Sequence, residues 1–149
     1  MSKCFKKIFA ITIALAILIA CIPTVSVFAE TLGGTCGENV NWSLDTDTGV
    51  LTISGSGDMD DYDWNNIAPW DSTSSYIKSV SIENGITSIG DAAFRGCSSL
   101  SSITIPDSVK SIGSSAFSYC SSLTAINVGG GNQSILYRMA FCLIKIKQN

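Results

Sequence analysis

Two stretches of the chain are near copies of each other. Residues 80–102 read VSIENGITSIGDAAFRGCSSLSS and residues 103–125 read ITIPDSVKSIGSSAFSYCSSLTA, an offset of 23 positions. A third copy begins at Ile126 and stops after Val128. Self-similarity at a fixed period of this size indicates one small unit stacked on its neighbours, because such a unit cannot bury its apolar face alone. The repeat therefore predicts a solenoid.

The apolar spacing within each copy predicts the shape of one rung. Leu100, Ile103 and Ile105 recur as the same apolar pattern one copy later, and their alternation is typical of a strand with one buried face. We therefore predict a β-rich solenoid of 23-residue rungs with a parallel sheet along one edge. The predicted core positions are Val80, Ile82, Ile89, Phe94, Cys97, Leu100, Ile103, Ile105, Ile112, Phe117, Cys120, Leu123 and Ile126.

Two further features of the rung follow from its small residues. Ser114–Phe117 is predicted to form a short helical or 3₁₀ turn that places an aromatic ring in the core. Gly90 and Gly113 suit tight or left-handed bends, since glycine adopts them without a steric cost.

The string SIGxxAFxxCSSLxxIxIPxSVxSIG, within residues 77–128, resembles the bacterial leucine-rich repeat of BspA-like cell-surface proteins. Pro69-Trp70 and the Gly- and Trp-containing segments 34–37, 42–45 and 49–55 resemble the module that often precedes such repeats. The resemblance implies noncatalytic adhesion or binding to an extracellular protein or host surface, with no cofactor. The expected organisation is a signal peptide (1–29), a small β-hairpin capping module (30–76), the solenoid (77–128) and an aberrant, disordered tail (129–149).

The first 29 residues have the pattern of an export signal. Lysines precede the apolar run 8–22, and Val27-Phe28-Ala29 fits the small-x-small site of signal peptidase. The run is shorter than the ~20 residues that span a bilayer. We expect cleavage before Glu30 and a secreted or surface protein. Lipidation of Cys21, which follows Leu18-Ile19-Ala20, is the alternative.

Charge and cysteine usage exclude several classes of function. After residue 29 the chain has 12 acidic and six basic residues, a net charge of −6, so it is a poor candidate for nucleic-acid binding. The chain has no histidine, which leaves nucleophilic catalysis without its usual base. Cys97 and Cys120 hold equivalent positions in successive copies, and we interpret them as buried free thiols.

Residues 58–66 form the densest polar cluster. Asp61, Asp63 and Asn65 have the first spacings of a calcium loop, although glycine and the terminal acid of that loop are missing. A calcium- or carbohydrate-binding module built on Asp58–Asp63 and the tryptophans is therefore an alternative function. Glycoside cleavage by Asp58 and Asp60 is a remote one. The structural interpretation is a solvated connection.

The remaining expectations concern aromatic residues, the sheet face and the tail. We assign Trp42, Tyr62, Trp70 and Tyr76 to the core, with Trp64 as the exposed exception. Outward strand positions predict a weak, multivalent binding face of on the order of 150 Å². Its predicted ligand-binding residues are Ser79, Ser81, Ser102, Thr104 and Asn127. The acid-free end of the chain, after Gly131, is interpreted as a truncated repeat or one read out of frame.

Overall fold

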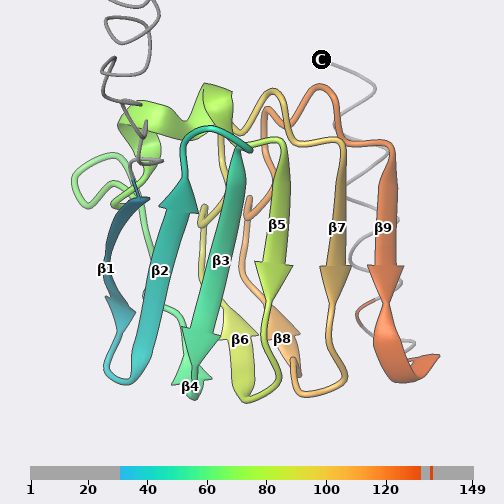
Figure 1. Cartoon of the computed structure of the whole chain (residues 1–149). Coiled ribbons are helices and arrows are strands. Elements are labelled where there is room, and N and C mark those ends of the chain that lie inside the picture. Colours follow the sequence, from blue (N-terminus) through green and yellow to red (C-terminus); the bar gives the residue numbers. More distant parts are fainter. Residues whose placement is uncertain (1–30, 132–134, 136–149) are drawn as a thin grey trace, which may run out of the picture.

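The computed structural model describes residues 31–131 and 135, which form two stacked sheets joined by turns (Figure 1). The predicted signal peptide and most of the predicted tail lie outside these residues. The elements are β1 (Thr31–Gly37), β2 (Val40–Asp45), β3 (Val50–Gly55), β4 (Gly57–Asp58), η1 (Asp71–Tyr76), β5 (Ser79–Ile82), β6 (Ile86–Ile89), β7 (Ser102–Ile105), β8 (Ser111–Ile112), β9 (Ala125–Val128) and η2 (Gly129–Gly131). Within them, no helix has the length and apolar character needed to cross a membrane.

The larger sheet has the strand order β1-β2-β3-β5-β7-β9. β1, β2 and β3 pair antiparallel, and the strands from β3 to β9 pair parallel. Ser79 pairs with Ser102, which in turn pairs with Ala125, so equivalent positions of successive sequence copies lie side by side. Apolar residues of these strands face inward, as alternation along a half-buried strand requires.

A second, smaller parallel sheet, β4-β6-β8, lies behind the first (Figure 1). Its strands are two to four residues long, too short for alternation to reveal them in the sequence. The segment expected to be helical or 3₁₀ at Ser114–Phe117 is instead an irregular turn, with Ser115 at φ 57°. That left-handed residue interrupts a helical path.

Parallel stacking begins before the sequence copies do. β3 pairs with β5, and β4 pairs with β6, in the same parallel sense as the later strands. The N-terminal segment therefore contributes a three-stranded antiparallel meander to the main sheet and also a first rung between β3 and η1. At the other end, Gly129–Gly131 form the 3₁₀ turn η2, and Ile135 is buried in the common core.

A column of aromatic rings runs through the core from the meander to the turns that follow β6 and β8. Trp42 meets Trp70 edge to face, with ring centroids 5.6 Å apart. Trp70 stacks on Phe94 at 5.9 Å and Phe94 stacks on Phe117 at 5.5 Å. The predicted rung core is buried throughout except at Ile126, which is partly buried and packs against it. The rings thus join the meander to the rungs in one core.

Gly90 and Gly113 differ from expectation in their conformation. Neither has a positive φ, so left-handed bending is not what requires glycine there. A Cβ atom on Gly90 would meet the Asp60 carbonyl oxygen, and one on Gly113 would meet the backbone and side chain of Asp91. The glycines are therefore required because adjacent rungs approach closely at this corner.

Candidate functional site

The outward face of the main sheet carries the residues that the sequence predicts for binding. Ser81 and Thr104 pair directly and are exposed, while Ser79 and Ser102 are partly exposed. Asn127 continues the row of Thr104 on β9. The β5 and β7 residues line a shallow hollow of about 340 Å³, and Val80, Ile82 and Ile103 are the apolar residues of this lining. Ligand binding at these residues stays a prediction.

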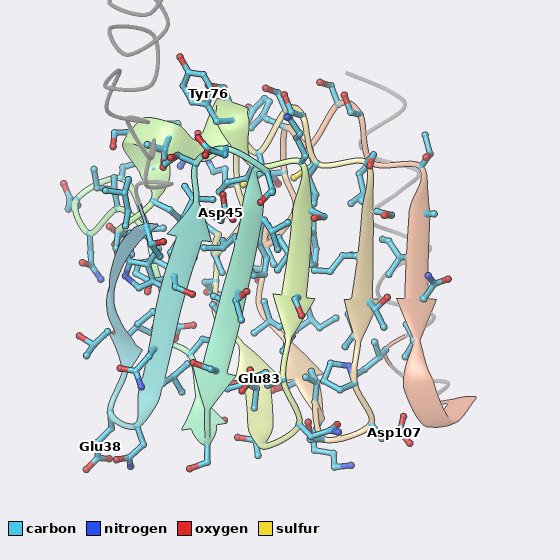
Figure 2. All side chains as sticks on the ribbon, viewed as in Figure 1. Glu38, Asp45, Tyr76, Glu83 and Asp107 are labelled. Atoms are coloured by element: carbon cyan, nitrogen blue, oxygen red, sulfur yellow. The ribbon has the colours of Figure 1, made fainter. Side chains whose placement is uncertain are left out.

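This face is wider and more uniform than the repeats alone indicate. Thr52 of β3 pairs with Ser81, and Ser43 of β2 pairs with Thr52, so the row of small polar side chains crosses into the meander. Charged residues occur at the ends of the strands: Figure 2 shows Asp45 near one end of the sheet and Glu83 near the opposite end. The face can donate and accept hydrogen bonds, but its strand positions from β3 to β9 carry no charge.

The Asp45 side chain forms hydrogen bonds within the turn between β2 and β3. Its carboxylate accepts hydrogen bonds from the amides of Asp47 and Thr48, both at 3.0 Å. The bond from Thr48 is the main reason that the pKa of Asp45 lies below its usual range. The side chain is thus ionised at neutral pH and holds the turn.

The predicted metal-ligating residues lie in a loop whose carboxylates bond to backbone amides. Asp63 accepts from the amides of Asn65 and Asn66, at 2.6 and 2.8 Å. The bond from Asn66, followed by that from Asn65, lowers the pKa of Asp63. Asp61 accepts from the amide of Asp91 at 2.8 Å. No group of three or more His, Cys, Asp or Glu residues suited to a metal ion occurs in the part of the chain that the structure describes.

Asp91 repeats the role of Asp61 one rung later. Its carboxylate accepts a hydrogen bond from the amide of Ser114, as Asp61 accepts one from Asp91. We call this series of bonds the carboxylate relay. It shows that carboxylates at this corner connect one rung to the next, which accounts structurally for part of the polar cluster.

The two carboxylates considered for glycoside cleavage are not placed together in the hollow, which β5 and β7 alone line. Asp58 accepts a hydrogen bond from the Thr87 hydroxyl at 2.6 Å, and this bond is the main cause of its lowered pKa. The backbone amide of Asp60 donates to the Cys36 carbonyl at 2.8 Å. Both residues connect neighbouring segments.

The aromatic residues divide between core and surface. Trp42, Trp70 and Tyr62 are buried, whereas Trp64 is 77% exposed and has the Arg95 guanidinium carbon 3.3 Å from its ring centroid. Tyr76, which we assigned to the core, is exposed, because it ends η1 and projects from it (Figure 2).

Sequence reasoning did not single out two exposed apolar residues, Ile67 and Tyr119. One signal was available for the second of them. Tyr119 occupies the position of Gly96 in the preceding copy, and that exchange replaces the smallest residue with a large aromatic one.

The three cysteines of the described chain are buried and form no disulfide bond with one another. Burial is the main cause that raises the pKa of the Cys36 thiol to about 12, and burial also raises the pKa of Cys97. The Cys120 thiol donates to the Phe94 carbonyl at 3.0 Å. The Cys36 and Cys97 thiols therefore remain protonated near neutral pH, and all three cysteines serve as small packing groups.

Comparison with known proteins places this architecture. The model of the family described as "BspA type Leucine rich repeat region (6 copies)" matches residues 72–148, more than half of the chain. The chain belongs to the BspA-type leucine-rich repeat family. A leucine-rich repeat protein from Eubacterium ventriosum ATCC 27560 has a similar solved structure, with a TM-score of 0.62 and 34% sequence identity. The alignment covers 67% of this chain and 26% of that protein. A search of curated proteins gives no match.

BspA-type repeats belong to a class of proteins that typically bind other proteins and are noncatalytic. The parallel strands of the described chain agree with a repeat solenoid of this class. The chain spans about a quarter of the length of this structural relative.

Proposed function

We propose that this chain is a secreted or surface-exposed, noncatalytic protein that adheres to an extracellular protein or host surface. The observation that carries the proposal is the outward face of the main sheet, where Ser81 and Thr104 lie in a row of small polar groups. Family membership supports a role in protein binding. The export pattern of residues 1–29 supports the location.

The size of the face favours weak contacts that act together. Six strands at ~4.8 Å spacing and ~13 Å length present roughly 370 Å². A stable interface needs ~800 Å² per partner. One copy therefore binds weakly, and many copies on one surface gain avidity without new contacts.

Adhesion is tested with the full chain coupled at high density to beads and applied to epithelial cell layers. Ser81→Lys and Thr104→Lys place charged, long side chains on the face, so we expect bead attachment to fall at least tenfold. Asn84→Lys adds the same charge at an exposed turn after β5 and leaves attachment unchanged. If beads that carry each of the three variants attach as well as beads with the wild-type chain, the sheet face has no role in attachment.

Export is tested separately by sequencing the N-terminus of protein recovered outside the producing cell. Cleavage after Ala29 gives a chain that begins with Glu30. A mature terminus at lipidated Cys21 contradicts this processing and supports the lipoprotein alternative.

A further inference from the structure

The first rung contains an insertion that the others lack. The relay bond spans 30 residues between Asp61 and Asp91, but 23 between Asp91 and Ser114, so the first rung has seven more residues. Trp70 stacks on Phe94, so the first and second rungs are aligned again at Trp70. Nearly all of the seven extra residues therefore lie between Asp61 and Trp70. We call residues 62–69 the inserted loop; it projects beside β1 in Figure 1. In repeat proteins, insertions of this kind gather on one face, often the binding face.

The inserted loop is fixed by its own hydrogen bonds. Besides the two amide bonds to the Asp63 carboxylate, the Asp63 amide donates to the Asn66 carbonyl at 2.8 Å. The Asn66 side chain donates to the Asp61 carbonyl at 3.0 Å. These bonds order the backbone on both sides of Trp64, although 77% of its surface is exposed; Ile67, which is 60% exposed, follows the bonded turn directly. A preordered apolar side chain loses little conformational freedom when a partner covers it.

Arg95 connects the loop to the next rung. Its guanidinium lies over one face of the Trp64 ring, which leaves most of the indole accessible. Tryptophan and arginine are the residue types most often found at energetically dominant contact points. The pair therefore forms a defined contact surface, with one member on each of two successive rungs.

Tyr119 extends this surface to a third rung. The Gly96 amide donates to the Ser118 carbonyl at 2.9 Å, so the turn that follows Arg95 lies beside the turn that holds Tyr119. Tyr119 has φ 60° and is 63% exposed, whereas Gly96 adopts φ 77° at the equivalent position. A left-handed conformation is disfavoured for a residue with a Cβ atom. Compared with glycine, a tyrosine at this position buries little apolar surface and makes the left-handed backbone less favourable, so it does not stabilise the fold.

The charges around this surface indicate the chemistry of a partner. Residues 50–77 contain five aspartates, at positions 58, 60, 61, 63 and 71, and no basic residue. Arg95 on the next rung adds one positive charge, and its guanidinium lies over the Trp64 ring. The aspartates at 60, 61 and 63 are exposed in or directly before the inserted loop. A partner that places an apolar side chain on Trp64 is thus favoured when it also carries positive charge.

We propose that Trp64, Ile67, Arg95 and Tyr119, the aromatic patch, bind a lysine- or arginine-rich protein segment that carries an apolar anchor. This inference rests on the proposed protein-binding function and assigns a second contact surface, separate from the outward sheet face. The exposed large apolar side chains of the described residues all lie outside that sheet, and the strands of the sheet from β3 to β9 carry no charged residue. The two surfaces therefore suit different ligands.

The test measures fluorescence anisotropy of labelled 12-residue peptides with the full chain at fixed salt. One peptide alternates lysine with leucine, a second alternates lysine with serine, and a third alternates glutamate with leucine. We expect the lysine–leucine peptide to bind at least tenfold more tightly than either of the others. Trp64→Ser and Tyr119→Gly should each weaken it at least tenfold.

Tyr119→Gly is the decisive variant, because it restores the residue of the preceding copy and relieves the left-handed backbone. Tyr76→Ser, which removes an equally accessible tyrosine from η1, should leave peptide binding unchanged. Equal binding of the glutamate–leucine peptide, no peptide binding at all, or full affinity of the Tyr119→Gly chain overturns the proposal. If bead attachment depends on Ser81 and Thr104 while these peptide results fail, the sheet-face function stands and the aromatic patch does not.

Discussion

The stacked pair Phe94 and Phe117 offers the sharpest test of the core. Phe117→Ala removes a ring that is fully buried and has its centroid 5.5 Å from that of Phe94, at an interplanar angle of 24°. Because Phe117 lies on the last rung in the aromatic column, its loss leaves Phe94 in contact with Trp70. The change thus isolates one stacking contact and one buried volume.

The expected loss in unfolding free energy follows from two contributions. Withdrawing a phenyl group from water stabilises the fold by ~1.5–3 kcal/mol, and an aromatic pair adds ~0.5–1.5 kcal/mol. The cavity that remains brings Phe→Ala changes to ~3–5 kcal/mol. Phe117→Leu keeps most of the volume and should cost less than ~1.5 kcal/mol. Phe94→Ala should cost more than Phe117→Ala, since Phe94 stacks on rings from both sides.

Urea unfolding of the full chain, followed by tryptophan fluorescence, measures these differences. With a denaturant slope of ~2 kcal/mol per M, the midpoint of Phe117→Ala should fall by ~1.5–2.5 M. The order of stability should be wild type, then Phe117→Leu, then Phe117→Ala, then Phe94→Ala. A Phe117→Ala protein with the wild-type midpoint and slope would refute a core built on stacked rings.

Two further predictions concern the rung corner and the thiols. Gly90→Ala brings a Cβ atom against the Asp60 carbonyl and should lower the unfolding free energy, measured by thermal melting, by ~1–3 kcal/mol. The control Ser111→Ala, at an exposed strand position, should change it by less than ~0.5 kcal/mol. A Gly90→Ala protein as stable as wild type would contradict the close approach of the two rungs. Burial raises the pKa of Cys36 from its ordinary 9.0 to about 12, so the stability it contributes is complete below pH 9 and is lost as pH rises toward 12. Between pH 8 and pH 10.5, the urea midpoint should fall less in Cys36→Ala than in wild type. An equal fall of the midpoint in both proteins would show that Cys36 does not titrate in this way.

The parts of the structure that depend on exact repetition were predictable from the sequence. Ile82 and Ile105 recur in register, and strand alternation is sufficient to place them inside and Ser81 outside. Phe94 and Phe117 lie in turns, and their recurrence as the large apolar residue of each turn is what predicts their burial. Family membership followed from the same string. Local patterns report burial well when each unit repeats the environment of the previous one.

The first rung was hidden because its insertion breaks the period. Asp61 and Asp91 perform the same role at a separation of 30 residues, which no search at a 23-residue offset detects. The short strand β4 adds no usable alternation. Likewise, the requirement for glycine at position 90 comes from the carbonyl of another rung, so only the assembled structure reveals it.

The carboxylate relay gives the stack a direction. Each accepting carboxylate belongs to the earlier rung and each donating amide to the later one. Two neighbouring rungs therefore make different contributions to the bond between them, and their order in the stack matters. Ser114 occupies the position of Asp91 in the next copy, and because it has no carboxylate the relay ends there among the described rungs. A gene duplication that copied residues 80–102 would supply a new acceptor, whereas one that copied residues 103–125 would not. In a lengthened array the carboxylate relay would therefore continue only through units that carry aspartate at this position.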